Sequence, residues 1–228
     1  MCGRYYIDDK TARDVEEELG LPKGALSLKA GDITPGIMAS ALFANKNGSN
    51  DGKNIEIKTY KCNIADKCNT TDKRNTTDNN KTFDTINVSE IFWGIKGKDK
   101  KLIINARAET VLEKTMFSES VLRRRCILPA AGFYEWDKEK NKVTFYRNDK
   151  SPIYLAGFYQ LSENRDSFVV LTTAANKSMI QVHDRMPLMI DKAEVKDWLW
   201  DSYAAKEMLS EKMPQLNSHM EYEQLSLF

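Results

Sequence analysis

Short apolar runs, many of them β-branched or aromatic and separated by Gly, Asn, Asp or Lys, recur along the chain from residue 91 onward. Runs of this length between turn-forming residues are typical of strands. The pattern predicts strands at Ile91–Trp93, Leu102–Ile104, Ile127–Trp136, Val143–Tyr146, Ile153–Tyr159 and Phe168–Thr173. Two earlier strands are expected at Arg4–Ile7 and Ala39–Ala44.

Helices are predicted between and after these strands. The first has Asp8 or Asp9 as its N-cap and ends before Gly20, with Pro22 beyond. Others are expected at Ser118–Arg125, Asn176–Val182 and Ala193–Leu209. Strands joined mainly by short turns predict an α+β fold, in which a curled, largely antiparallel and barrel-like sheet carries peripheral helices.

The segment from about Lys46 to Thr85 breaks this pattern. Its composition shifts to Asn, Lys, Thr and Asp, with a near-repeat of Asn69–Asp72 at Asn75–Asp78. We interpret residues 46–85 as a low-complexity insertion of unknown role in a single domain that spans residues 1–222, with residues 223–228 as a separate tail.

Size and charge narrow the possible functions. A chain of 228 residues suits one substantial core. With 34 Lys and Arg against 33 Asp and Glu, the formal net charge is +1, so any DNA binding needs a local basic groove. No apolar run of about 18 residues and no signal-peptide pattern is present, which favours a cytoplasmic monomer without a membrane partner.

The four cysteines, at positions 2, 62, 68 and 126, are expected to be free thiols in a reducing compartment. Five residues separate Cys62 from Cys68 and no histidine lies near them, which is poor spacing for zinc. We therefore expect no metal and no cofactor.

Cys2 carries the sharpest chemical signal. Removal of Met1 would leave a cysteine with a free α-amine, whose pKa of about 8 keeps far more of it neutral and nucleophilic at pH 7 than a lysine amine. An aldehyde can condense with this amine to an imine, and the neighbouring sulfur can then close a thiazolidine ring. Taken alone, a small residue at position two is explained more simply by methionine trimming.

Four separated motifs change that balance: Met1–Tyr5 (MCGRY); Ile104–Thr110 (INARAET); Arg125–Trp136, with RCILP and GFYEW; and Leu171–Asn176 (LTTAAN) together with His183–Pro187 (HDRMP). In this order and spacing they resemble the SRAP family, the SOS-response-associated peptidase proteins that shield abasic sites in single-stranded DNA. The resemblance covers nearly the whole chain outside the insertion.

The resemblance implies roles for four residues. Cys2 would be the crosslinking nucleophile and Asn105 would orient its amine, while Glu135 and His183 would move protons during sugar ring-opening and loss of water. Each also has a simpler explanation. Glu135 can form a structural salt bridge, His183 can be a hydrogen-bonded structural histidine, and Asn105 can be a turn residue.

The resemblance also implies a DNA groove. Arg4 and Arg107 match the family's phosphate-binding arginines, and Trp93 and Pro35 fall where the family lines the groove. The alternatives are surface salt bridges for the arginines and core packing for Trp93. The run Arg123–Arg125 can add positive field or complement a helix dipole. After Gly94 the family usually continues with apolar wedge residues, whereas Ile95–Asp99 is largely charged or glycine, which puts that side of the groove in doubt.

The last residues resemble the pentapeptide that docks bacterial proteins on the replication sliding clamp. Leucine and phenylalanine would fill an apolar pocket and glutamine would bond at its rim. The predicted contacts are Gln224, Leu225, Leu227 and Phe228. The tail can instead pack on the domain; clamp docking would place the protein at replication forks on the nucleoid.

Three functions remain open. The first is an abasic-site sensor that forms a covalent crosslink through Cys2, with strand-cleaving lyase activity as a side reaction. The second is a thiol peptidase, including self-removal of a leader, with Cys2 as nucleophile and His183 as base. The third is a clamp-tethered module that binds single-stranded DNA without a covalent bond.

Overall fold

The computed structural model describes residues 2–26, 30–44, 58–61, 85–97, 99 and 101–221. The helices are α1 (Asp9–Glu18), α2 (Ser118–Arg123), α3 (Val195–Trp200) and α4 (Ser202–Met208), with 3-10 turns η1 (Ala108–Glu113) and η2 (Lys192–Glu194). The strands are β1 (Tyr5–Ile7), β2 (Gly31–Ile33), β3 (Met38–Ala44), β4 (Lys58–Lys61), β5 (Thr85–Trp93), β6 (Ile95–Lys96), β7 (Leu102–Ile103), β8 (Asn105–Arg107), β9 (Arg125–Ala130), β10 (Gly132–Trp136), β11 (Lys142–Tyr146), β12 (Ile153–Gln160), β13 (Ser167–Ala174), β14 (Arg185–Pro187), β15 (Met189–Ile190) and β16 (Asn217–Glu221).

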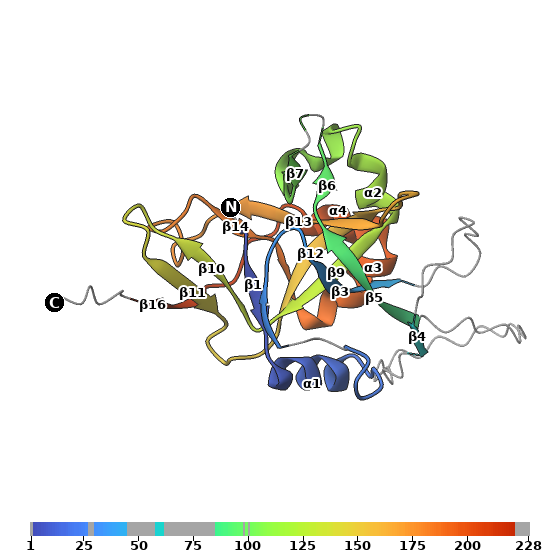
Figure 1. The fold of residues 1–228 in the computed structure, drawn as a ribbon, viewed down its shortest axis with the longest axis horizontal. Helices are drawn as coiled ribbons and strands as arrows, with labels where there is room; N and C mark the ends of the chain where they lie inside the picture. The colour runs from blue at the N-terminus through green and yellow to red at the C-terminus, as the bar shows by residue number, and fades with distance from the viewer. Residues whose placement is uncertain are drawn as a thin grey trace, which may run out of the picture.

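The larger sheet closes on itself. Strands β13, β12, β9, β3 and β5 each pair with the next, and β5 returns to pair with β13 in parallel (Figure 1). Every residue of β9 is buried, as expected for a strand inside a closed and packed ring. The structure confirms the predicted α+β class and the curled, mainly antiparallel sheet.

A second sheet, ordered β16-β11-β10-β1-β2, is antiparallel throughout and carries the N-terminal strand. The single strand predicted at Ile127–Trp136 is wrong, because the chain leaves the ring after Ala130 and enters the second sheet at Gly132. A Cβ at Gly132 would lie 2.4 Å from the Phe145 carbonyl oxygen and 2.7 Å from Cε1 of Tyr6. Only glycine permits this approach of β10 to its neighbours.

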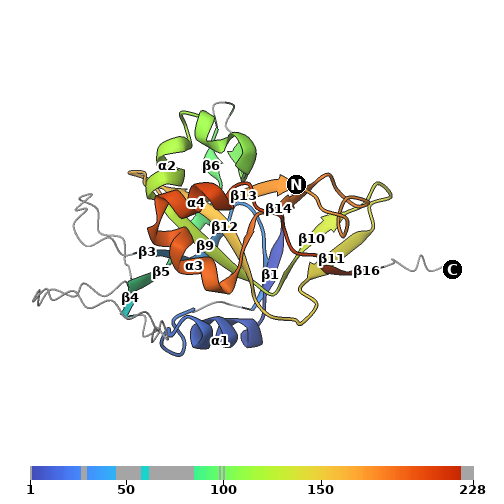
Figure 2. The same ribbon diagram turned by 180° about the vertical axis from the view of Figure 1, so that it is seen from behind.

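Helices cover the outside of the ring. Figure 2 shows α2, α3 and α4 gathered on one side and α1 alone below. As predicted, Asp8 caps α1, accepting a 2.7 Å bond from the Thr11 amide. The helix predicted at Ala193–Leu209 is interrupted, because Asp201 ends α3 and its carboxylate caps α4.

The helix predicted at Asn176–Val182 is wrong: the residues form turns. The Asn176 side chain accepts from the backbone and hydroxyl of Ser178 and donates to the carbonyls of Met213 and Pro214. The backbone keeps isolated turn bonds, such as Ile180 N–H to the Asn176 carbonyl, while the Asn176 side chain bonds locally, which favours turns over a continuous helix.

The interpretation of Arg123–Arg125 as a source of external charge is wrong for Arg125, which is buried. Its guanidinium donates to the carbonyls of Val121 and Leu122 in α2 and of Trp198 and Leu199 in α3. Burial lowers the pKa of Arg125 to about 10, which still leaves it charged at neutral pH. The residue ties two helices to β9.

Most of the predicted insertion, and the tail from residue 222, lie outside the described residues. Within the segment, β4 pairs with β5 along Lys58–Lys61, and β5 itself begins at Thr85, six residues before the predicted strand at Ile91. Buried polar residues at Asn87 and Ser89 hid this extension from the apolar pattern. Among the described residues, no helix is long and apolar enough to cross a membrane.

Candidate active site around the second residue

Cys2 lies immediately before β1, where the two sheets meet. Its side chain is fully buried, and its carbonyl accepts a 2.9 Å hydrogen bond from Nδ2 of Asn105. Asn105 is the first residue of β8, which runs parallel to β13 on the ring, with Asn105 opposite Val170. A side chain of the ring therefore holds the start of the second sheet, and the structure brings Cys2 and Asn105 together.

The thiol of Cys2 is protonated at neutral pH. Burial, helped by the negative charge of Glu135, raises the pKa of the thiol to about 12, while a backbone hydrogen bond from Arg4 opposes the shift. Such a sulfur is a poor thiolate nucleophile until it is exposed or loses its proton to a neighbouring group.

Glu135 is the buried carboxylate next to Cys2. It lies on β10, with 5% of its surface exposed, and β10 pairs with β1 through Phe133 and Tyr5. The Asn105 side chain, which bonds to the Cys2 carbonyl, also carries Oδ1, which is buried and accepts no hydrogen bond from a described residue. Buried acceptors of this kind are uncommon in proteins and mark places where a ligand or a reacting group binds.

His183 lies two residues before β14, the strand that pairs with the end of β13. In Figures 1 and 2 the start of the chain lies beside β14. The imidazole Nδ1 is 3.0 Å from the Arg185 amide that donates to it and 2.9 Å from Oδ1 of Asp184. These contacts engage Nδ1 and fix the orientation of the imidazole ring.

Arg185 forms a bidentate salt bridge with Glu109, with N–O distances of 2.7 and 2.8 Å, and also donates to the Thr172 carbonyl. The pair connects η1 to β14 and so fixes the turn that carries His183. The hydrogen bonds from Arg185 hold the pKa of Glu109 below its usual value. Sequence reasoning gave neither residue a role, although both lie inside the quoted motifs.

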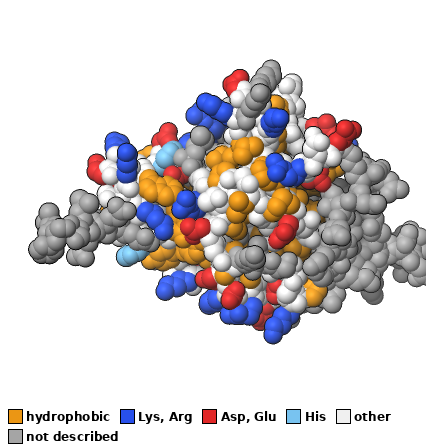
Figure 3. Space-filling model, in the orientation of Figure 1, with side chains coloured by type: hydrophobic (Ala, Val, Ile, Leu, Met, Phe, Trp, Pro, Cys, Tyr) orange, Lys and Arg blue, Asp and Glu red, His pale blue; other side chains and the backbone are white. Residues whose placement is uncertain are grey.

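Arg4 and Arg107 are both accessible. The Arg4 guanidinium lies 3.6 Å from an Asp32 carboxylate oxygen and 5.4 Å from the centre of the Trp136 ring. Arg107 is exposed at the end of β8, opposite Thr172. Figure 3 shows lysines and arginines, with some acidic side chains, around a group of apolar side chains on the face seen in Figure 1.

Metal chemistry has no evident ligand set. Among the described residues, no group of three or more histidine, cysteine, aspartate or glutamate side chains is placed to bind an ion.

Comparison with known proteins decides the family. The sequence profile of the family described as SOS response associated peptidase (SRAP) matches residues 1–227. The chain belongs to the SRAP family. This confirms the resemblance drawn from the four motifs.

Named relatives in this family are abasic site processing proteins. YedK of Escherichia coli is 30% identical over 131 residues, which are 54% of this chain and 59% of YedK. YoaM of Bacillus subtilis is 34% identical over 127 residues, 49% of this chain and 56% of YoaM. HMCES of Xenopus tropicalis is 30% identical over 123 residues, 42% and 37% of the two chains. The matched parts thus span less than two thirds of each relative.

Solved structures support the SRAP fold. A protein from Bordetella bronchiseptica superposes with a TM-score of 0.66 at 18% identity, over 97% of this chain and 100% of that chain. One from Bacteroides thetaiotaomicron gives 0.53 at 23% identity, over 60% and 70%. At these identities the likeness concerns the fold alone.

Trp93 does not have the role that the SRAP resemblance suggested. The ring is fully buried, its Nε1 donates to the Ile104 carbonyl at 3.0 Å, and it packs between Tyr5 and Phe168 at centroid distances of 5.3 and 5.8 Å. It has no face for a base to stack on, so the alternative of core packing applies.

Pro35 lies half-buried in the turn between β2 and β3, where the next amide, of Gly36, donates to the Trp93 carbonyl. After this turn Ile37 and Met38 are 42% and 45% exposed, and Leu102 of β7 is 39% exposed. The sequence did not single out these exposed apolar side chains.

Proposed function

We propose that this SRAP protein recognises abasic sites in single-stranded DNA and bonds to them covalently through Cys2 after removal of Met1. The observation that supports the proposal is the position of Cys2, held by Asn105 at the junction of the two sheets with Glu135 beside its thiol. The names of the relatives point to the same substrate, abasic DNA.

The chemistry begins at the amine. Without Met1, the α-amine of Cys2 lies next to the carbonyl that Asn105 holds, and the unpaired Oδ1 of Asn105 can accept a hydrogen bond from it. An amine of pKa about 8 is neutral in about one molecule in ten at pH 7, whereas only about one thiol of pKa about 12 in 10⁵ is ionised. The nitrogen lone pair therefore attacks the sugar aldehyde first.

Proton transfers follow. The carbinolamine loses one water to give an imine, and the sulfur then bonds to the same carbon while the thiol proton moves to nitrogen, which closes a thiazolidine. Glu135, whose charge acts on the Cys2 thiol, would accept a proton at Cys2, and the imidazole of His183 would protonate the departing oxygen. An imine also acidifies the next sugar carbon, so strand cleavage by a lyase step competes until the ring closes.

Arg4 and Arg107 would bind the phosphates that flank the lesion, because both are accessible and guanidinium groups bind phosphate oxygens in pairs. Pro35 with its exposed neighbour Ile37 would contact a base. We also propose that residues 1–222 act as one domain and that Gln224, Leu225, Leu227 and Phe228 bind a sliding clamp.

The raised thiol pKa argues against a thiol peptidase, which needs an ionised sulfur at neutral pH. A purely non-covalent DNA-binding module would leave the buried Cys2, Asn105 and Glu135 together without a use.

The test mixes purified protein with single-stranded DNA that carries one abasic site, followed by a denaturing gel and intact mass spectrometry. We expect an adduct whose mass is that of the protein without Met1 plus DNA, less one water. Cys2→Ser keeps the amine but loses the thiol, so it should give an adduct only when borohydride reduces the imine. Cys62→Ala serves as the cysteine control and should crosslink normally.

Two results would count against the proposal. One is no adduct from protein shown to begin at Cys2. The other is an equally stable adduct with DNA that contains no abasic site.

A further inference from the structure

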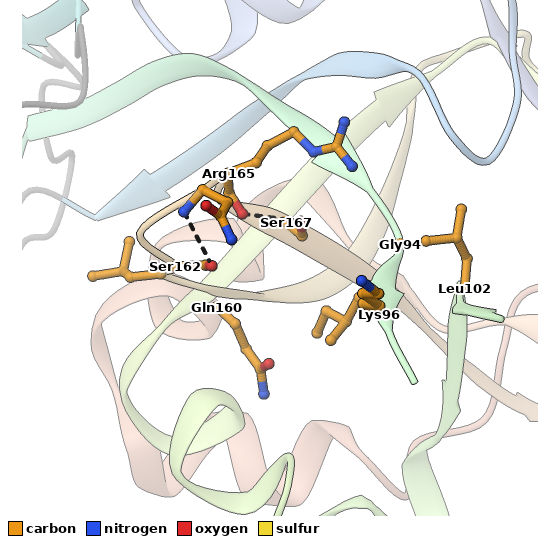
Figure 4. A pocket seen from close by; sticks show the side chains of 10 residues that line it. Gly94, Lys96, Leu102, Gln160, Ser162, Arg165 and Ser167 are labelled. Carbon is orange, nitrogen blue, oxygen red and sulfur yellow. Dashed lines mark hydrogen bonds between the residues drawn. The ribbon is translucent and has the colours of Figure 1, made fainter. Parts of the chain in front are cut away.

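A cavity separate from the Cys2 site lies beside Ser167, the first residue of β13. It has a volume of about 660 Å³ and is bounded by the β5–β6–β7 segment on one side and by the β12–β13 connection on the other (Figure 4). Its lining includes Gly94, Lys96 and Leu102 from the first side and Gln160, Ser162 and Arg165 from the second. This volume lies in the range of cavities that hold small ligands.

Two cations border the cavity. Lys96 and Arg165 are both exposed, and neither forms a salt bridge with another residue in the described part of the chain. The Arg165 guanidinium lies 3.2 Å from the centre of the Phe92 ring, which holds it in place by a cation–π contact. The nearby Asp166 carboxylate accepts from the Ser162 amide and is thus engaged within the turn.

The remaining surface suits a base. Leu102 is 39% exposed. It packs closely on Gly94, which has a φ of +120°; a Cβ added to Gly94 would lie 3.2 Å from the Cβ of Leu102. Gln160 donates its amide to the Met116 carbonyl at 2.6 Å, which orients its oxygen as an acceptor for base amino groups. The apolar wall and the oriented amide suit a base, and the two cations suit a phosphate, so together they can bind a nucleotide.

The cavity is in line with the Cys2 site along β13. Ser167 in its lining lies opposite Phe92, and Val170, three residues further on, lies opposite Asn105. At about 3.3 Å per residue the two places are about 10 Å apart along the strand, close enough for neighbouring nucleotides of one DNA strand to reach both.

We infer that this cavity binds a flanking nucleotide of the single-stranded DNA, with its base against Leu102 and its phosphate between Lys96 and Arg165. The inference rests on the proposed function, since the same DNA strand runs from Cys2 along β13 to the cavity.

The test measures binding of the full chain to DNA that carries a tetrahydrofuran abasic analogue, which cannot crosslink. The oligonucleotides have one flanking nucleotide on each side, or ten on the 5′ side or ten on the 3′ side. Lys96→Ala/Arg165→Ala should bind one of the two long oligonucleotides at least tenfold more weakly than the unaltered protein and the short one equally. Its salt slope, log K against log salt, should fall by about 1.4, or ~0.7 for each of two lost phosphate contacts.

Lys206→Ala/Lys212→Ala removes the same charge from exposed positions away from the cavity and should change neither quantity. Equal loss on short and long DNA, or no loss on either long oligonucleotide, would overturn the inference. So would binding of free deoxynucleoside monophosphate without any dependence on DNA length, because the cavity would then serve a free nucleotide. Failure of the Cys2 crosslink alone would leave the length dependence intact, so the two proposals fail separately.

Discussion

At the scale of single residues, the chemistry depends on a thiol that the protein keeps neutral and covered. Cys2 is fully buried and its pKa is raised to about 12, so at pH 8 only about one thiol in 10⁴ is ionised, against about one in four for a free cysteine. In the chain that still carries Met1, we expect alkylation of Cys2 by iodoacetamide to be at least a hundredfold slower than in the same chain unfolded in guanidinium.

Peptide mapping by mass spectrometry would measure this rate for each cysteine. The fully buried Cys126, whose pKa burial also raises, is the internal control and should be protected alike. Rapid labelling of Cys2 alone would mean that its surroundings open in solution.

Residue by residue, the sequence named candidates whose proximity only the fold could show. Cys2, Asn105, Glu135 and His183 were expected to act together; in the structure Asn105 bonds to the Cys2 carbonyl and the charge of Glu135 acts on the Cys2 thiol. The resemblance implied a place for Trp93 in the DNA groove, with core packing as the alternative. The sequence alone could not decide between them, because it does not show whether the ring faces solvent or the core. Arg185 and Glu109 were missed because a pairing between residues 76 positions apart leaves no local pattern.

At the scale of elements, the ion pair between Glu109 and Arg185 connects η1 to β14. Because the folded pKa of Glu109 lies below its unfolded value, the pair stabilises the fold above the unfolded pKa of about 4.3, and this contribution is lost as pH falls through the folded pKa. Glu109 is 43% exposed, so screening limits the effect. We expect Glu109→Gln to lower unfolding free energy by about 0.5–1 kcal/mol at pH 7.

Urea unfolding at pH 7 and at about pH 3 would test this, and the difference from the unaltered protein should vanish at the lower pH. Glu119→Gln is the control. Its carboxylate is 68% exposed and its contact with Arg124, at 3.4 Å, is longer than that of Glu109 with Arg185, so the change should have little effect at either pH. A loss that persists at pH 3 would point to packing instead of charge.

Arg125 joins elements in a different way, through backbone carbonyls of α2 and α3. Arg125→Met keeps the length of the side chain but leaves these buried acceptors without a donor, so we expect a loss of about 3–5 kcal/mol in unfolding free energy. The neighbouring Arg123 is exposed, and Arg123→Met should stay within about 0.5 kcal/mol. Chemical denaturation of both variants would distinguish a structural arginine from one that only adds charge.

Element boundaries show where local pattern is insufficient. Apolar runs located the ring strands, but they could not show that Ile127–Trp136 changes sheets, because both halves are buried and look alike in sequence. The turn at Asn176 was predicted as helix because its apolar spacing fits one, whereas its side chain bonds to Ser178 and to the 213–214 segment.

At the scale of the whole molecule, the sequence indicated a curled sheet but not its closure. The ring closes through the parallel pairing of β5 with β13, and strands 75 residues apart carry no mark of that partnership. The motifs identified the family without any information on this pairing, because a resemblance compares residues and their spacing and not strand partners.

The proposed clamp peptide is separable from the domain. If the tail acts as a separate docking peptide, deletion of residues 223–228 should leave the melting temperature and the Cys2 crosslink unchanged while abolishing binding to a purified sliding clamp. Leu227→Ala/Phe228→Ala in the full chain should reproduce the loss in surface plasmon resonance. Clamp binding that survives both changes would rule out the tail as the docking element.

The pairing of β1 with β10 also sets a timetable for synthesis. Tyr5 cannot pair with Phe133 until Phe133 has been synthesised, which takes a ribosome about 6–26 s more at 5–20 residues per second. During that interval β1 can pair with β2 but still lacks β10, the strand that carries Glu135, and an aminopeptidase can reach Met1. Once β10 arrives, Cys2 becomes covered, so exposure of its amine is decided while the chain is still being made.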